Sequence, residues 1–185
     1  LIINDLLQFS RPTANSPICT ATDINEVIRS TQVLVKHDLT RKKVTMRLDL
    51  RASTPAASHR QKMQQVLINL IVNALSATQK GGTLVIRSRN WRHEGVLISI
   101  RDNGCGMDQE TLKRIFDPFY SKTEGGTGLG LSVTYSILES MSAEIAVRSK
   151  VQVGSTFFIW LPRYSEARNP ESNQTAPKGI IEESS

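Results

Sequence analysis

Apolar residues recur at three- and four-residue spacings over His59–Gln79, a pattern that predicts an amphipathic helix. The apolar positions are Met63, Val66, Leu67, Leu70, Ile71, Ala74 and Leu75. Asn69 and Asn73 are four residues apart, so they lie one turn apart on one edge of this helix. A buried amide needs hydrogen-bond partners, and its oxygen is a suitable ligand for Mg²⁺. The pair therefore indicates either a ligand site or two amides on a solvated helix edge.

Similar patterns predict the remaining elements of the chain. Helical spacing and capping residues predict helices over residues 1–10, 23–40, 108–114 and 129–142. The first residue of the second helix, Asp23, forms a capping-box pattern with Glu26. Residues 53–58 are expected to form a loop. Apolar or alternating runs predict strands over residues 18–22, 44–50, 83–91, 95–101, 143–150 and 155–161.

The strand predicted over residues 95–101 leads directly into Asp102-Asn103-Gly104-Cys105-Gly106. Glycines at such a position permit positive φ and a close approach of the backbone to a ligand. A carboxylate at a strand end accepts hydrogen bonds from an exocyclic amine, such as that of adenine. The same residues also suit an ordinary Asp-Asn-Gly turn. This segment alone leaves both interpretations open.

A glycine-rich segment, Gly125–Ser132, introduces the last predicted helix. Its Gly-x-Gly-x-Gly spacing places bare backbone amides and a helix N-terminus together, an arrangement that receives phosphate. The spacing differs from the dinucleotide-binding fingerprint and from the P-loop, which argues against both of those sites. Ser121–Gly126 is short and rich in small residues, so it suits a mobile lid.

These motifs, in this order, resemble the N, G1, F and G2 boxes of sensor histidine kinases. They are Asn69-x-x-x-Asn73-Ala74, Asp102-x-Gly104-x-Gly106, Ile115–Tyr120 and Gly126–Ser132. The similarity covers roughly residues 1–163, and the residues of these motifs are similar to those of the nitrogen-regulation branch of that family. The resemblance implies an α+β fold of the Bergerat type. In this two-layer α/β sandwich, helices cover one face of a mixed, mostly antiparallel sheet.

The resemblance also implies how the chain is divided. Residues 1–12 would end the second helix of a dimerisation and phosphoacceptor hairpin, and residues 13–17 would form a linker. Residues 18–163 would form the ATP-binding catalytic domain. Residues 164–185 are rich in Ser, Glu, Asn, Pro and Lys and poor in apolar residues, which predicts a disordered tail.

The function implied is transfer of the γ-phosphate of ATP, with Mg²⁺, to a histidine on the hairpin and then to a response regulator receiver domain. That histidine would lie upstream of Leu1. His37, His59 and His93 have no shared spacing and no carboxylate cluster, so each is expected to be an ordinary residue. The implied partners are therefore the chain's own hairpin, which makes the full protein a homodimer, and the receiver domain.

The resemblance assigns roles to individual residues. Asn73 would ligate Mg²⁺, with Asn69 beside it near the phosphate path. Asp102 would bind the adenine amine. Lys122 would either pair with a phosphate or be a solvated surface lysine. Gly104, Gly106 and Met107 would shape the base pocket, and the phosphates would contact Gly126, Thr127, Gly128, Leu129, Gly130 and Leu131.

Some residues separate this chain from its relatives in the family. Related ATPases have a glutamate where Asn69 stands, and an asparagine cannot accept a proton from water as that base does. This favours transfer to a histidine over hydrolysis. Ser142 and Gln152 occupy positions where the family commonly has glycine. Phe116 and Phe119 would either dock the lid or belong to the core.

Net charge, the lengths of apolar runs and the cysteine count exclude several classes of function. The 185 residues carry a net charge of +6, but no aromatic residues interleave a basic stripe, so nucleic acid is not an expected partner. No run of 18 apolar residues or signal peptide is present, and the two cysteines lie in no metal-like cluster. A cytoplasmic location is expected, with any membrane anchor in other segments of the parent protein. The alternatives are an ATPase or serine kinase of this fold, or a degenerate nucleotide-sensing scaffold.

Overall fold

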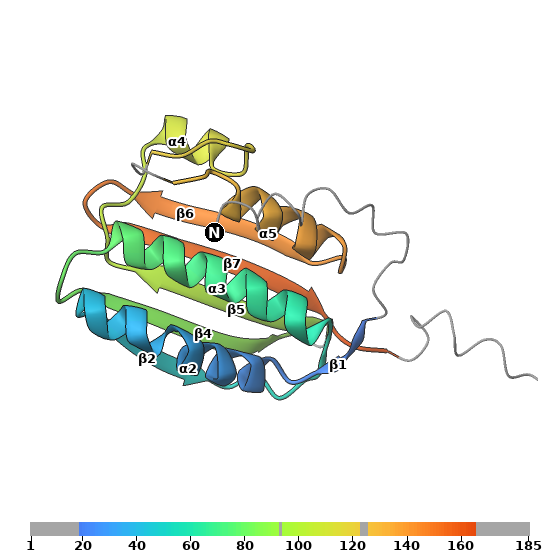
Figure 1. The fold of residues 1–185 in the computed structure, drawn as a ribbon. Coiled ribbons are helices and arrows are strands. Elements are labelled where there is room, and N and C mark those ends of the chain that lie inside the picture. The colour runs from blue at the N-terminus through green and yellow to red at the C-terminus, as the bar shows by residue number, and fades with distance from the viewer. Residues whose placement is uncertain (1–18, 93, 123–125, 166–185) are drawn as a thin grey trace, which may run out of the picture.

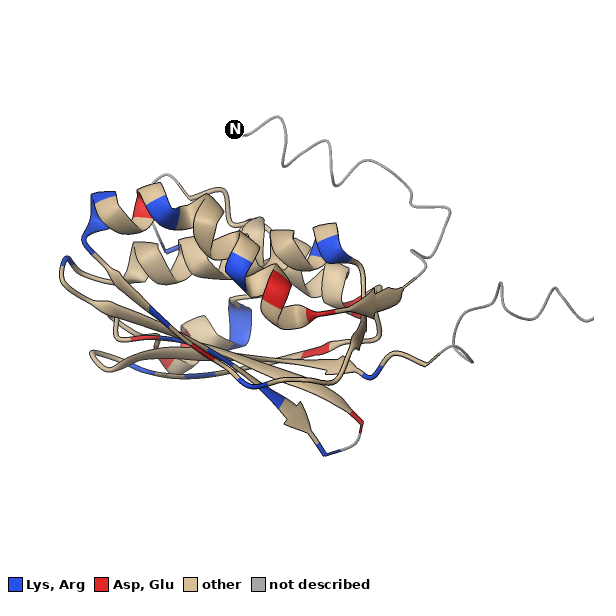
Figure 2. Ribbon diagram, turned by 90° about the horizontal axis from the view of Figure 1, so that it is seen from below, with Lys and Arg blue, Asp and Glu red and all other residues tan. Residues whose placement is uncertain are grey.

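The computed structural model describes residues 19–92, 94–122 and 126–165. Figure 1 shows a sheet with helices α2, α3 and α5 packed over one of its faces, while Figure 2 shows the two layers from the side. The helices are α2 (Ile24–Lys42), α3 (Arg60–Ala77), α4 (Gln109–Arg114) and α5 (Gly130–Glu139). This arrangement confirms the predicted α+β sandwich.

The main sheet has the strand order β2-β4-β5-β7-β6. Only β2 and β4 pair in parallel, and every other neighbouring pair is antiparallel, as expected for a mixed sheet. A smaller sheet pairs β1 with β3. The strands are β1 (Thr20–Thr22), β2 (Thr45–Leu50), β3 (Ala56–Ser58), β4 (Thr83–Trp91), β5 (Gly95–Asp102), β6 (Glu144–Lys150) and β7 (Gly154–Pro162).

Burial alternates along the central strands, so that one face of the sheet meets the helices. On β5 the residues that face the core are Val96, Ile98 and Ile100, each at most 1% exposed. The same face of β7 contributes Phe157 and Ile159. The apolar residues predicted for α3 are all buried against this surface. The core therefore lies between α3 and the middle of the sheet.

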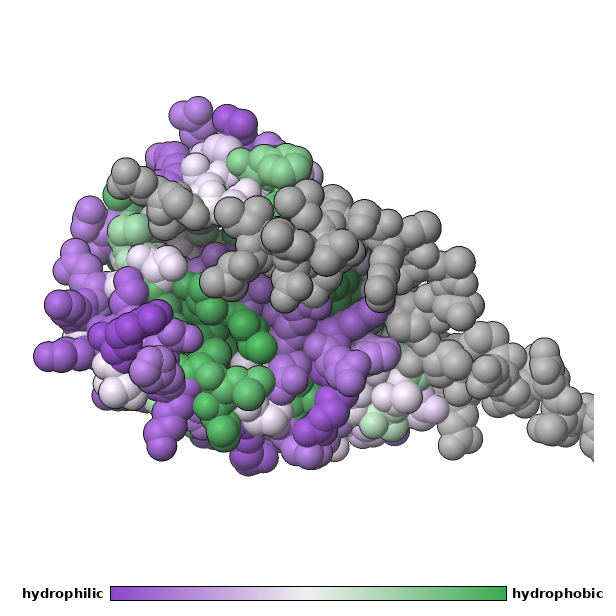
Figure 3. Space-filling model, viewed as in Figure 1, coloured by the Kyte–Doolittle hydropathy of each residue, from purple (hydrophilic) through white to green (hydrophobic). Residues whose placement is uncertain are grey.

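The register between α2 and α3 decides which edge of α3 remains for ligands. Arg60 pairs with Glu26 at 2.9 Å, and Gln64 donates to Ser30 at 3.3 Å. Both contacts join residues 34 positions apart, so the helices run side by side in the same direction. Val33 and Leu34 of α2 and Val72 of α3 are exposed. Figure 3 shows an apolar surface on the face that carries the helices. Because α2 covers one side of α3, the opposite edge with Asn69 and Asn73 faces α5.

Three local expectations need correction. The loop predicted over residues 53–58 contains strand β3, because Ala56–Ser58 pair with the distant β1, a contact that local periodicity does not encode. The side chain of Asp23 caps α2 through Asn25 N and Glu26 N, but the Glu26 carboxylate pairs with Arg60. The helix expected to run to residue 142 ends at Glu139. The helix expected over residues 1–10, the linker over 13–17 and residues 166–185 lie outside the described residues.

Candidate nucleotide-binding site

Asn69 joins α3 directly to the start of α5. Its Nδ2 donates to the carbonyl oxygen of Gly130 at 3.2 Å and to Thr134 Oγ1 at 3.4 Å. The Thr134 hydroxyl in turn donates to the same Gly130 carbonyl at 2.8 Å. The first and last of the predicted motifs, which are 61 residues apart in sequence, therefore meet in space.

Asn73 lies one turn further along the same edge of α3. Four residues of helix correspond to about 6 Å along the axis, so the two amides are close neighbours. Asn73 is half-buried, and its amide makes no hydrogen bond to any residue that the structure describes. An unpaired amide oxygen beside a phosphate-receiving segment fits the oxygen-donor chemistry of Mg²⁺.

Asp102 ends β5 and is only 3% exposed. Its Oδ1 accepts hydrogen bonds from Gly104 N at 2.8 Å and from Ser155 N at 3.3 Å. Both of these bonds are accepted by Oδ1, which leaves Oδ2 as the candidate acceptor for a ligand amine. Burial raises the pKa of the Asp102 carboxyl, and the backbone hydrogen bonds oppose that shift.

The loop after Asp102 is held by the end of α3 and by the turn between β6 and β7. Cys105 N donates to the carbonyl of Ala77 at 3.0 Å, and Gln152 N donates to the carbonyl of Cys105 at 2.7 Å. Gly104 is buried at this contact with α3. The loop is thus fixed from both sides before any ligand arrives.

A second contact with the β6–β7 turn fixes Met107 and Gly106. Met107 N donates to Ser149 Oγ at 2.8 Å. Gly106 has φ of +67°, and a Cβ there would lie 2.0 Å from the carbonyl oxygen of Lys150. Ser149 and Gln152 are therefore supporting residues of the site that the sequence motifs did not reveal. Only their pairing with a segment more than 40 residues away identifies them.

The glycine segment leads into α5 without a side-chain cap. Gly126 and Thr127 are exposed, and Gly128 has φ of +68°. Leu129 is the buried N-cap residue, and the first helical residues are Gly130 and Leu131. Because no side chain caps this end, the N–H groups of the first turn are free to bind an anion. Thr127 Oγ1 accepts from Leu129 N at 3.4 Å, but no side chain caps the first turn of α5, so Thr127 is not its cap.

Lys122 is held at α4 in this structure. Its Nζ lies 2.8 Å from Asp108 Oδ2, and Asp108 also caps α4 through Thr111 N. The hydrogen bond from Lys122 is the largest cause of a strongly lowered Asp108 pKa, and the same bond raises the pKa of Lys122. Lys122 is therefore an exposed but paired lysine. Of the lid expected over residues 121–126, residues 123–125 lie outside the described part of the chain.

The two phenylalanines of the Ile115–Tyr120 motif differ in environment. Phe116 packs on Tyr135 of α5 with ring centroids 5.7 Å apart, and it also borders the core. Phe119 is 73% exposed and has φ of +64°. Phe116 therefore joins the core, whereas Phe119 is an exposed ring beside the glycine segment, where Phe119 N donates to the Gly128 carbonyl.

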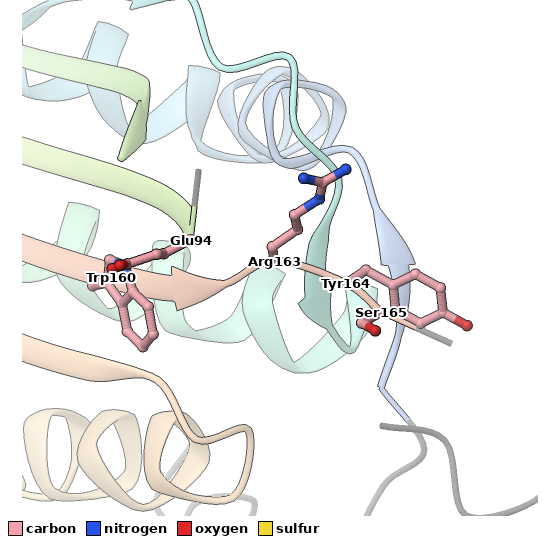
Figure 4. A pocket seen from close by; sticks show the side chains of 5 residues that line it. All are labelled: Glu94, Trp160, Arg163, Tyr164 and Ser165. Carbon is pink, nitrogen blue, oxygen red and sulfur yellow. The ribbon is translucent and has the colours of Figure 1, made fainter. Parts of the chain in front are cut away.

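The cavity of about 570 Å³ in Figure 4 lies elsewhere. It is lined by Glu94, Trp160, Arg163, Tyr164 and Ser165, at the end of β5 and β7 opposite to Asp102. The seven-residue rise along β5 separates the two ends by about 24 Å. Its lining includes one cation, Arg163, and one carboxylate, Glu94, but neither the glycine segment nor the start of α5 contributes to it, so the arrangement described above for phosphate is not repeated there.

Residues 58–165 match the family model described as "Histidine kinase-, DNA gyrase B-, and HSP90-like ATPase", which covers more than half of the chain. The chain belongs to this ATPase family. The resemblance read from the motifs is thereby confirmed, and the domain is an ATP-binding domain. No helix among the described residues is long and apolar enough to span a bilayer.

The similar proteins and structures include histidine kinases. The signal transduction histidine-protein kinase AtoS of Escherichia coli is 34% identical over 94% of this chain, which spans 28% of AtoS. The catalytic domain of histidine kinase ThkA superposes with a TM-score of 0.71 at 28% identity, covering 78% of this chain and 95% of that domain.

A structure of ThkA in complex with response regulator protein TrrA shares the fold, with a TM-score of 0.72 at 24% identity. It covers 88% of this chain and 46% of that one. The chain thus spans little more than a quarter of AtoS and less than half of ThkA.

Proposed function

We propose that this domain binds Mg²⁺·ATP between α3, the Asp102 loop and the start of α5, and donates the γ-phosphate to a histidine of the parent protein. The observation that carries this proposal is the position of α3. Its asparagine edge bonds to Gly130 at the start of α5, and its last residue, Ala77, accepts a hydrogen bond from the Asp102 loop. One helix thus links the amine-accepting carboxylate to the uncapped helix that suits phosphate.

The two ends of the site suit the two ends of ATP. Asp102 Oδ2 matches the adenine amine as an acceptor, and Gly104, Gly106 and Met107 would border the base. The first-turn amides of α5, together with the segment from Gly126 to Leu131, match the phosphates. Phosphoryl transfer depends mainly on such positioning and on charge neutralisation.

Magnesium would be held chiefly by ATP itself in this proposal. Among the described residues no cluster of three or more His, Cys, Asp or Glu side chains could hold a metal ion, so this part of the chain offers few anionic ligands. The Asn73 oxygen would supply one ligand, and phosphate oxygens and waters the rest, as Mg²⁺ commonly prefers. When bound, the metal would neutralise charge that develops on the transferred phosphoryl group.

Asn69 supports transfer to a histidine over hydrolysis. Its amide has no basic atom, and Nδ2 is already used to bind Gly130 and Thr134. A water molecule in front of the γ-phosphate would therefore lack a general base at this position. We infer that the acceptor is a histidine on a dimerisation hairpin outside the described residues, and that a response regulator then receives the phosphate. A domain with this activity would use cytoplasmic ATP, so we propose that it lies in the cytoplasm.

Two measurements test the proposal together. Calorimetric titration of this chain with ATP should show tighter binding in Mg²⁺ than in EDTA, and Asn73→Ala should reduce that difference. The parent protein incubated with γ-labelled ATP should gain an acid-labile, base-stable phosphate. Steady ATP hydrolysis without a phosphorylated protein would indicate an ATPase instead. Undetectable nucleotide binding would indicate a scaffold.

A further inference from the structure

Thr134 is a fully buried polar residue that none of the sequence motifs includes. It lies on α5, one turn after Gly130, and its exposed fraction is 0%. Burying a hydroxyl is unfavourable unless it is hydrogen-bonded, and valine has nearly the same shape without that penalty. The hydrogen bonds of the hydroxyl are therefore the reason we infer for a threonine at this position.

The bonds of Thr134 leave one orientation for the neighbouring amide. Thr134 Oγ1 donates its proton to the Gly130 carbonyl, so towards Asn69 the same oxygen can only accept. The Gly130 carbonyl is an acceptor as well. The amide of Asn69 therefore faces two acceptors, and only its nitrogen can occupy that side.

We infer that Thr134 is a positioning residue, which together with the Gly130 carbonyl turns Asn69 so that Oδ1 is presented to the triphosphate end of the site. This rests on the proposed function. Oδ1 is an acceptor, and the phosphate oxygens of Mg²⁺-bound ATP are deprotonated near neutral pH. The chemical group that suits Oδ1 is therefore Mg²⁺ or a water in its hydration shell. Asn69 thus serves the metal and does not donate to a phosphate.

A purely structural role for Thr134 predicts something different. Threonine hydroxyls in helices often bond to the carbonyl four residues earlier, and Thr134 does so with Gly130. If that bond were its whole purpose, its loss would loosen α5 and weaken every nucleotide equally. The orienting role predicts a loss confined to ligands that bring the metal.

The matched variants are Thr134→Val, which removes the hydroxyl at constant shape, and Thr134→Ser, which keeps it. Each is titrated with Mg²⁺·ATP, with ATP in EDTA and with adenosine. Loss of one hydrogen bond predicts about three- to tenfold weaker Mg²⁺·ATP binding in Thr134→Val. Its affinities for adenosine and metal-free ATP should stay within about twofold of wild type, and Thr134→Ser should match wild type throughout.

A double variant tests whether Thr134 acts through Asn69. In an Asn69→Ala background the amide is absent, so Thr134→Val should cause no further loss of Mg²⁺·ATP affinity. An equal loss for all three ligands, an unchanged Mg²⁺·ATP affinity, or an additive double variant would overturn the positioning role. Failure of the wild-type chain to bind Mg²⁺·ATP would instead reject the proposed function. Thermal unfolding of each variant identifies any that fail to fold.

Discussion

The two ends of the candidate site are built in opposite ways. At the base end, the Asp102 loop is fixed by backbone hydrogen bonds to Ala77 and Gln152, and the carboxylate itself is buried. At the phosphate end, α5 starts without a side-chain cap, and the Asn69 amide links it to α3. The base end is thus complete without a ligand, whereas the phosphate end leaves donors unused.

This contrast indicates that the base end would select the nucleotide and that the phosphate end would bind the group to be transferred. A prebuilt base end selects the nucleotide at little entropic cost, because its donors and acceptors are already ordered. An uncapped phosphate end gains hydrogen bonds only when the anion arrives. Substitutions that disturb the backbone packing of the base loop should therefore destabilise the fold, and substitutions at the phosphate end should weaken binding without unfolding the domain.

The largest expected effect comes from a pair of glycine substitutions. Gly106→Ala places a Cβ 2.0 Å from the Lys150 carbonyl at φ of +67°, so it should lower the free energy of unfolding by about 2–4 kcal/mol. Gly130→Ala meets no atom within 4 Å, so it should leave stability unchanged or slightly raised while weakening ATP binding. Urea unfolding and calorimetric titration of both variants measure the contrast. Equal destabilisation by the two substitutions would contradict it.

Asp102→Asn isolates the chemistry of the base end from its folding. The new amide keeps an oxygen for Gly104 N and Ser155 N, but it replaces Oδ2 with a donor that opposes the adenine amine. We expect ATP binding to weaken by about 30- to 100-fold, and stability to change by less than about 1 kcal/mol. The same substitution should weaken the binding of inosine triphosphate by less, because inosine has an oxygen in place of the amine. Asp108→Asn, which alters an exposed carboxylate near α4, is the control and should leave adenosine binding unchanged.

Through the Asp102 carboxyl, the stability of the fold and the binding of adenosine should depend on pH in opposite senses. Burial raises the pKa of this carboxyl above its ordinary value of 3.8, so the folded state binds a proton more readily than the unfolded chain. Through Asp102 alone, stability therefore falls as pH rises from 3.8 through the raised pKa. Adenosine binding should change in the opposite sense, because protonation removes the acceptor. Comparison of wild type with Asp102→Asn from pH 4 to 7 extracts both contributions, and parallel changes would contradict the assignment.

Most elements of this fold could be predicted from local patterns, because α3 and the main strands carry clear apolar periodicity. The motifs also identified Asp102, Asn69 and the glycine segment. The contacts that hold them could not be predicted, since β3, Ser149 and Thr134 reach the site through residues far away in the sequence. The position of Lys122 was not predictable either, because its partner Asp108 has the local signature of an ordinary helix cap.

The smallest expected effect comes from restoring glycine at two positions where the family commonly has it. Gln152 and Ser142 have φ of +63° and +54°, so each keeps the left-handed backbone that glycine adopts without steric cost. Gln152→Gly and Ser142→Gly should each raise the free energy of unfolding by about 0.5–1 kcal/mol, because relief of strain exceeds the added entropy of the unfolded chain.

Gln152→Ala is the matched control for these substitutions, since it shortens the side chain but keeps the strained φ and should give no gain. The two positions also differ in what they support. Gln152 N donates to Cys105 in the base loop, whereas Ser142 lies beyond the C-terminal end of α5. If the base end is already fully ordered, Gln152→Gly should stabilise the fold without improving adenosine binding. Tighter adenosine binding by Gln152→Gly would show instead that strain in the β6–β7 turn is transmitted to the Asp102 loop.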